Sequence, residues 1–269
     1  MSVIEAVLWG ILQGVTEFVP VSSSGHLVLV PWLTGREPSS FTFDVLVHFG
    51  TLFAILIYFR HDLRDLIEGG IVLLRTRSIE TPEARMAWLI LLSLIPAVLV
   101  VLLFRHLFMQ LFSAPPAAAA LLLVTGTAMF LAEQYAARRR GMIALQARES
   151  VIIGVAQSVA LAPGISRSGA TISTGLVLGL RRPDAARFSF LMAIPAILGA
   201  TVLEFIQLLR GTIPNEPTPV LAAGFVAALI SGYLAIALLL RHLQNRGLRP
   251  FAYYCWAMGL FSLLVFLVR

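Results

Sequence analysis

Long apolar stretches, separated by short polar connections, make up most of the chain. Six of these stretches approach or exceed the roughly 20 residues that a helix needs to cross a bilayer. They predict membrane-spanning helices over residues 43–59, 86–104, 114–135, 188–209, 219–240 and 251–268. The segment 61–74 alternates charged with apolar positions, so we expect either an amphipathic helix at the membrane surface or a plain connecting helix.

Two further apolar regions, residues 1–33 and 149–180, are interrupted in the middle by segments rich in serine and glycine. The interruptions read PVSSSGH at residues 20–26 and PGISRSGAT at residues 163–171. Neither half of either region is long enough to cross a membrane alone. We therefore expect two helix–loop–helix hairpins that enter the membrane and return. A continuous span in each region is the alternative, but it would leave several polar side chains in lipid without a role.

The two interruptions occupy equivalent places in an internal repeat. A shift of 144 residues, without a gap, superimposes identical residues of the two halves: Ser22 on Ser166, Ser24 on Ser168, Gly25 on Gly169, Glu5 on Glu149, Gly10 on Gly154 and Gln13 on Gln157. The copies differ in their charged residues, because Glu17 and His26 occur in the first and Arg167 in the second. We interpret all 269 residues as one membrane domain with repeats of about 1–135 and about 149–269. The complementary charges predict one composite site.

Arginine supplies all 20 basic residues of the chain, and its distribution orients the predicted spans. It is dense in the connections 60–85, 136–148, 181–187 and 241–249. It is sparse in the connections on the other side, which contain Arg36, Arg105 and Arg210. By the positive-inside rule the dense group is cytoplasmic, so both termini are predicted to lie outside.

Each repeat then contains one hairpin and three spans. Because three is an odd number, the second repeat is inverted relative to the first, as in many secondary transporters. The first hairpin enters from outside and the second from the cytoplasm, so their loops can meet near the middle of the membrane. The predicted fold class is an all-α polytopic integral membrane protein with inverted-topology repeats.

Composition agrees with a membrane protein. Hydrophobic residues form 58% of the chain and charged residues 13%, whereas soluble domains contain about 25% charged residues. The net charge of +6 could suit a nucleic acid, but the basic residues lie in the short connections between apolar stretches. We therefore expect membrane lipids and no nucleic acid as partners.

The interrupted segments have the chemistry of a phosphate site. Helices that begin after each break would present free N–H groups and a partial positive charge to an anion. The Arg167 guanidinium adds a permanent charge and a planar fork that suits phosphate oxygens. The expected phosphate-binding residues are Ser22, Ser24, Gly25, Ser166, Ser168, Gly169 and Thr171. A purely structural ion pair between Arg167 and Glu17 is the alternative, but it does not need the serines.

The reacting groups are expected in the first repeat. Gln13 and Glu17 lie one helical turn apart, so their side chains share a face and could hold a divalent cation, Mg²⁺ or Ca²⁺, that also binds substrate phosphates. Ser23 is the expected nucleophile, although water or His26 remains open. His26, three residues after Ser23, could act as general base or acid, while Glu17 orients one of them or binds the cation.

Two more polar residues could support this site. Asp44 and His48 lie one helical turn apart in the first full span. Motifs of other phosphate and metal chemistries, such as a P-loop, a dinucleotide glycine motif or HExxH, do not occur in the sequence. The serine–histidine pair is not embedded in a GxSxG elbow either.

At these residues the chain resembles the undecaprenyl pyrophosphate phosphatases of the bacitracin-resistance type. The matching segments are QGVTEFVP at residues 13–20, SSSGH at 22–26 and PGISRSGAT at 163–171. The first motif of that family is Glu or Gln, three residues, then Glu, which Gln13 and Glu17 fit. The resemblance implies removal of the terminal phosphate of undecaprenyl pyrophosphate, which returns undecaprenyl phosphate to peptidoglycan synthesis.

The resemblance also implies how the protein is placed and what it binds. It implies a divalent cation and a multi-pass protein of the bacterial inner membrane, with a site open to the outer, periplasmic face. The expected catalytic residues are Glu17, Ser23, His26 and Arg167. The expected partners are a polyprenyl pyrophosphate and membrane lipids, with a homodimer left open. A transporter or flippase of a phosphorylated lipid or other anion is the alternative, because inverted repeats also serve transport.

Overall fold

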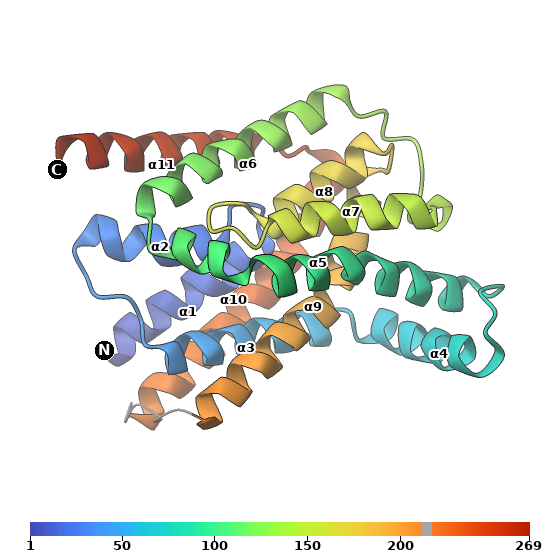
Figure 1. Ribbon diagram of the computed structural model, residues 1–269, viewed down its shortest axis with the longest axis horizontal. Coiled ribbons are helices and arrows are strands. Elements are labelled where there is room, and N and C mark those ends of the chain that lie inside the picture. Colours follow the sequence, from blue (N-terminus) through green and yellow to red (C-terminus); the bar gives the residue numbers. More distant parts are fainter. Residues whose placement is uncertain (211–216) are drawn as a thin grey trace.

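The computed structural model describes residues 1–210 and 217–269 (Figure 1). These residues form α-helices, one short 3-10 helix and connecting loops, with a single isolated bridge between Arg140 and Leu180. The helices are α1 (Val3–Phe18), α2 (Ser23–Thr34), α3 (Phe41–Tyr58), α4 (Arg60–Thr76), α5 (Pro82–Phe112), α6 (Pro115–Tyr135), η1 (Met142–Ala144), α7 (Ala147–Val159), α8 (Arg167–Val177), α9 (Arg182–Arg210), α10 (Thr218–Asn245) and α11 (Arg249–Val268).

The six predicted spans are confirmed as helices long and apolar enough to cross a bilayer. They are α3, the segment Pro82–Phe104 of α5, α6, the segment Arg182–Leu203 of α9, α10 and α11. Large apolar side chains on these helices face outward, such as Leu102 and Leu103 of α5, which are 74% and 73% exposed. An outer surface of this kind is stable in lipid and not in water. The chain is therefore a multi-pass, all-α membrane protein.

Both interrupted regions are confirmed as helix–loop–helix hairpins, and the alternative of continuous spans is wrong. The first hairpin breaks between α1 and α2, and the second between α7 and α8. The breaks have local causes: Pro20 follows the end of α1, and Gly164 has a φ of 94°, a left-handed conformation that favours glycine. In each hairpin the two helices pack against each other, and the second helix runs back alongside the first (Figure 1).

Glycines allow each hairpin to lie close to a long helix. A Cβ atom on Gly10 of α1 would overlap the carbonyl oxygen of Gly224 in α10, and one on Gly154 of α7 would overlap the carbonyl oxygen of Ser93 in α5. Gly10 and Gly154 are equivalent under the 144-residue shift. Two residues that the shift superimposes thus each lie against the backbone of a long helix. The internal repeats and their inverted topology stay predictions.

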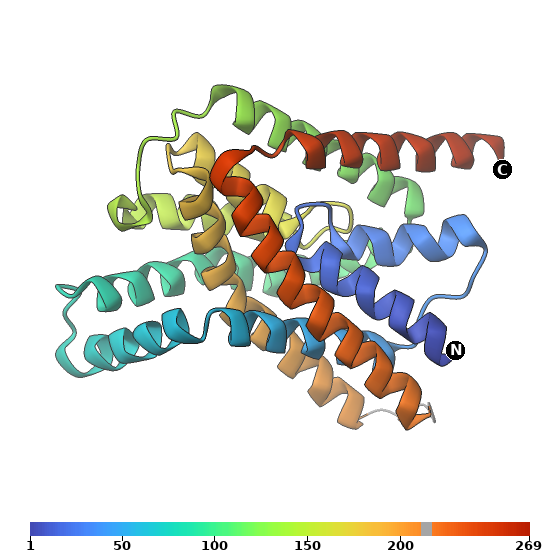
Figure 2. The same ribbon diagram turned by 180° about the vertical axis from the view of Figure 1, so that it is seen from behind.

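The two ends of the molecule differ in charge. The N- and C-termini lie at one end, together with the connection between α2 and α3, and the arginine-rich connections lie at the other (Figures 1 and 2). Helix α4, which falls in the predicted segment 61–74, lies at the arginine-rich end and packs along α5. The described arginine-rich connections therefore share one side of the molecule, as the positive-inside argument requires.

Candidate active site

The loops of the two hairpins meet in the interior of the protein. Ser22 caps α2, and its hydroxyl oxygen accepts the N–H groups of Gly25 in the same hairpin and Gly164 in the other, both at 3.2 Å. The loops are so close that a Cβ atom on Gly25 would lie 3.0 Å from the Cα atom of Gly164. Ser22 itself has a φ of 71°, a strained conformation of the kind that collects at functional sites.

The second loop is built in the same way and is fastened to α6. Ser166 caps α8, and its hydroxyl oxygen accepts the Gly169 N–H at 3.0 Å. Its own N–H donates to Thr125 of α6 at 3.1 Å, and the Thr125 hydroxyl donates to the Gly164 carbonyl at 2.9 Å. The capping role of Ser22 thus recurs in Ser166. The first N–H groups of α2 and α8 are left without an intrahelical partner.

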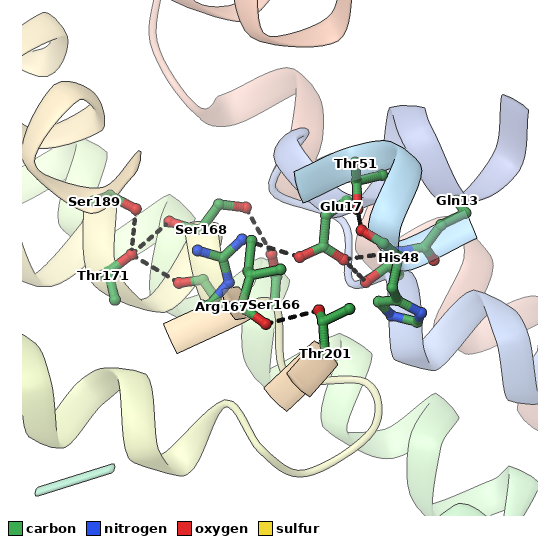
Figure 3. A network of polar contacts seen from close by, with 12 residues as sticks. Gln13, Glu17, His48, Thr51, Ser166, Arg167, Ser168, Thr171, Ser189 and Thr201 are labelled. Carbon is green, nitrogen blue, oxygen red and sulfur yellow. Dashed lines mark hydrogen bonds and ion pairs between the residues drawn. The ribbon is translucent and has the colours of Figure 1, made fainter. Parts of the chain in front are cut away.

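The Glu17 carboxylate, at the end of α1, joins both hairpins (Figure 3). One oxygen accepts a hydrogen bond from Nη2 of Arg167 at 3.0 Å. The other accepts the Ser23 hydroxyl at 2.7 Å and the amide nitrogen of Gln13 at 3.1 Å. The side chains of Glu17 and Arg167 are only 9% and 16% exposed. The structure therefore brings together four residues that were predicted for the site, from α1, α2 and α8.

Two polar atoms of this cluster are buried without a hydrogen-bond partner among the described residues. They are Nη1 of Arg167, a donor, and Oε1 of Gln13, an acceptor. A buried polar atom that lacks a partner costs about 1–3 kcal/mol, and more when it is charged. Such atoms are rare in native proteins and point to a ligand or an ordered water. The unpaired guanidinium nitrogen fits an anion beside Glu17 and Ser23.

His26 lies on the other side of the first turn of α2, and sequence reasoning did not place it there. Its Nδ1 is 2.7 Å from the carbonyl oxygen of Ser22, and its Nε2 is 2.7 Å from the hydroxyl of Tyr254 in α11. The side chain is 1% exposed. Both ring nitrogens are thus occupied, and neither is directed at Ser23. Sequence reasoning missed Tyr254, since one tyrosine in an apolar span has no pattern that reveals it.

The remaining predicted hydroxyls support the two loops. Ser24 and Ser168 lie 3.4 Å and 3.2 Å from the capping serines of their own loops. Thr171 shares a 2.6 Å hydrogen bond with Ser189 of α9, and also donates to the carbonyl of Arg167 at 2.8 Å. Thr171 therefore fastens the first turn of α8 to α9 (Figure 3).

His48 of α3 is a further neighbour of the cluster. It lies beside Gln13 and Glu17 and interacts electrostatically with Glu17 (Figure 3). Its Nδ1 is 2.7 Å from the carbonyl oxygen of Asp44. The carboxylate of Asp44 accepts the hydroxyl of Ser39 instead. Of the two residues that could support the site, the structure thus brings His48 close to Glu17.

The cluster offers oxygen ligands for a divalent cation but not a complete set. Within the described parts of the chain, no group of three or more His, Cys, Asp or Glu side chains could hold a metal. The unpaired Oε1 of Gln13 and the carboxylate of Glu17 are oxygen donors of the kind that Mg²⁺ and Ca²⁺ prefer. These residues fit a cation that takes its other ligands from water and from substrate phosphate.

Comparison with known proteins places the chain in a family. The sequence model described as bacitracin resistance protein BacA matches residues 6–261. A protein of Pelobacter propionicus named undecaprenyl-diphosphatase is 43% identical, over 94% of this chain and 93% of its own. Proteins of the same name are 42% identical in Methanobrevibacter smithii, over 97% and 96% of the two chains, and 41% identical in Thermomicrobium roseum, over 98% of each. The chain belongs to the bacitracin resistance protein BacA family.

Proposed function

We propose that the protein is an undecaprenyl-diphosphatase. It hydrolyses undecaprenyl pyrophosphate to undecaprenyl phosphate and inorganic phosphate, and so recycles the lipid carrier for peptidoglycan synthesis. Similarity along nearly the whole chain to proteins of that name supports the activity. The structural observation that carries the proposal is the buried Nη1 of Arg167, which has no hydrogen-bond partner among the described residues and lies beside the Ser23–Glu17 pair.

Ser23 is the nucleophile in this proposal, and Glu17 is its base. The Ser23 hydroxyl already donates to the Glu17 carboxylate at 2.7 Å, which is hydrogen-bonding reach for proton transfer. The Ser23 oxygen attacks the terminal phosphorus while its proton passes to Glu17. The bond to the bridging oxygen breaks, and its electron pair leaves with undecaprenyl phosphate. Water then hydrolyses the phosphoserine and restores the hydroxyl.

Arg167 is the proposed phosphate clamp. Its Nη2 is held by Glu17, which leaves Nη1 to donate to a phosphate oxygen. The first N–H groups of α2 and α8 add donors and partial positive charge at the same place. Phosphoryl transfer depends mainly on such positioning and electrostatic stabilisation. A divalent cation held by Glu17 and Gln13 would neutralise charge on the phosphate oxygens.

His26 has a different role from the one that its spacing to Ser23 suggested. Since its Nδ1 faces the Ser22 carbonyl and its Nε2 faces Tyr254, we propose that it supports the first turn of α2. His26 as the nucleophile is disfavoured by the same contacts. Direct attack by water, activated by Glu17, is the remaining alternative to Ser23.

The proposed location is the bacterial inner membrane, with the site open to the outer face. The first hairpin carries Glu17 and Ser23 beside its loop. Its open end, formed by the start of α1 and the end of α2, lies at the same end of the molecule as the termini and opposite the arginine-rich connections (Figure 1). If those connections are cytoplasmic, substrate reaches Glu17 from outside.

Phosphate release by the purified protein tests the activity. We expect detergent-solubilised protein to release phosphate from undecaprenyl pyrophosphate without any membrane gradient, and chelation of divalent cations to reduce the rate. A pure transporter cannot hydrolyse its cargo, so an absence of release under these conditions would refute the proposal. Full activity in excess chelator would remove the cation from the mechanism and leave the phosphatase in place.

A further inference from the structure

Helix α11 contacts the first hairpin through a polar pair in an otherwise apolar span. The Tyr254 hydroxyl is 2.7 Å from Nε2 of His26, and the two rings stack with centroids 5.7 Å apart at an angle of 9°. A neighbouring residue, Cys255, lies 3.8 Å from the carbonyl oxygen of Pro20 in the loop of that hairpin. This loop precedes Ser22 and Ser23. The N-terminal half of α11 thus touches the segment that carries the proposed nucleophile.

The backbone fixes the tautomer of His26. A carbonyl oxygen can only accept, so the Nδ1 that faces Ser22 must carry the proton. In the neutral imidazole, Nε2 is then an acceptor, and the Tyr254 hydroxyl donates to it. The chain of contacts therefore runs from the Tyr254 hydroxyl through the ring of His26 to the Ser22 carbonyl. That carbonyl also accepts the His26 N–H at 3.2 Å, as the first hydrogen bond of α2.

Access to the two side chains is unequal. His26 is 1% exposed and has both nitrogens occupied, whereas Tyr254 is 45% exposed on the outward side of α11. A substrate that leaves this arrangement intact cannot touch the His26 ring. Any effect of His26 on the reaction must therefore pass through the backbone of Ser22 and the first turn of α2, where Ser23 lies.

We propose that Tyr254 is a positioning residue for this reaction. By donating to His26 it holds the imidazole against the Ser22 carbonyl, and so keeps the first turn of α2 where the Ser23 hydroxyl meets Glu17. The inference rests on the proposed function, because it takes Ser23 as the nucleophile. It goes beyond that function in giving α11 a part in catalysis through a residue that contacts neither Ser23 nor Glu17.

Tyr254→Phe tests the hydroxyl alone, because it removes that group and keeps the stacked ring and its packing. We expect kcat to fall about fivefold to tenfold with KM unchanged, as for the loss of one hydrogen bond that orients the reacting group. Tyr253→Phe is the matched control: Tyr253 is 52% exposed on the same helix and contacts the rings of Phe130 and Trp256. This control should keep the wild-type kcat. A wild-type kcat in Tyr254→Phe would overturn the proposal.

A double-mutant cycle tests whether Tyr254 acts through His26. In a His26→Phe background, which keeps an aromatic ring but removes both ring nitrogens, Tyr254→Phe should cause no further loss, because the partner that transmits its effect is gone. Losses that multiply in the double variant would mean that Tyr254 acts elsewhere, and would overturn the proposal.

Nitrogen NMR of protein labelled at histidine provides a readout that does not need activity. His26→Gln identifies the His26 signals by their loss. In the wild type, we expect one protonated ring nitrogen and one that accepts a hydrogen bond. Tyr254→Phe should shift the accepting signal, and Tyr253→Phe should leave it in place. An unchanged signal in Tyr254→Phe would refute the contact. Absence of phosphate release by the wild type would instead refute the phosphatase, while the NMR shift would still decide whether Tyr254 positions His26.

Discussion

At the scale of single residues, the proposed clamp depends on the two terminal nitrogens of Arg167 having different partners. One terminal nitrogen binds Glu17, and the other is buried with no hydrogen-bond partner in the part of the chain that the structure describes. Arg167→Lys keeps the charge, but the single ammonium group of lysine must then bind both Glu17 and the phosphate. We expect kcat/KM for phosphate release to fall about a hundredfold, the size of effect seen when one donor to a developing oxyanion is removed.

A second arginine on the surface provides the control for that variant. Arg241 is exposed near the end of α10, so Arg241→Lys should leave kcat/KM unchanged. Turnover close to that of the wild type in Arg167→Lys would show that the reaction does not need one guanidinium nitrogen on Glu17 and the other on the phosphate.

The residues of the site were predictable to different degrees, for physical reasons. A carboxylate and a guanidinium in apolar surroundings must find partners, so the sequence predicted that Glu17 and Arg167 share one composite site. Their direct ion pair, which the structure contains, was named only as the alternative to a phosphate site. The three-residue spacing of Ser23 and His26 suggested a direct contact, but the imidazole turns to the Ser22 carbonyl instead. Tyr254 lies 228 residues from His26 in sequence, and local periodicity cannot report so distant a contact.

At the scale of the elements, the close approach of the two loops depends on glycine. A Cβ atom at position 25 would lie 3.0 Å from the Cα atom of Gly164, and backbone cannot yield as a flexible side chain can. We expect Gly25→Ala to destabilise the protein by about 1–3 kcal/mol and to reduce activity, because the loops must separate. Thermal unfolding in detergent and phosphate release measure the two effects.

Helix α4 offers a matched glycine for comparison. Gly70 has nothing within 4 Å of an added Cβ atom, so Gly70→Ala should keep activity and unfold at the same or a higher temperature. If Gly25→Ala behaves like Gly70→Ala, the loops do not need this close contact.

The start of α7 is held by an ion pair whose strength depends on pH. Burial opposes ionisation of Glu149, but hydrogen bonds from the Arg140 guanidinium and the Gln146 N–H outweigh it and hold the pKa of this carboxyl below its ordinary value. A lowered pKa in the folded state stabilises the protein above the ordinary value of about 4.3, and this contribution is lost as pH falls through the lowered pKa.

Glu149→Gln should therefore lower the thermal midpoint near neutral pH and flatten its decline in acid. Melting curves in detergent from neutral pH to about pH 3 compare the two proteins. An identical acid decline in both would mean that the ion pair does not contribute to stability.

The breaks, the spans and the meeting of the two hairpin loops were predicted, whereas the packing of the helices against one another was not. Pro20 and the serine–glycine segments identified both hairpin loops, because proline and glycine act locally on the backbone. The segment 61–74 left two interpretations open, and the structure gives a helix along α5. Which helices pack together depends on interactions across the whole chain, and no single stretch of sequence carries them.

At the scale of the whole molecule, the orientation in the membrane can be measured with the native thiol left in place. Cys255 is buried, so it should react slowly with added reagents. Glu37 lies at the end of the termini, and Glu80 lies in an arginine-rich connection; both are exposed. We expect Glu37→Cys to react with a membrane-impermeant maleimide in spheroplasts, and Glu80→Cys to react only after lysis. The reverse pattern would invert the proposed orientation.

We propose that two hairpins, one from each half of the chain, assemble a phosphoryl-transfer site around Ser23, Glu17 and Arg167. The most direct test is rapid quenching of the purified protein with undecaprenyl pyrophosphate labelled at its terminal phosphate, followed by identification of the labelled residue. We expect label on Ser23 within one turnover, and no labelled protein in Ser23→Ala. Label on His26, or turnover without any labelled protein, would contradict this proposal.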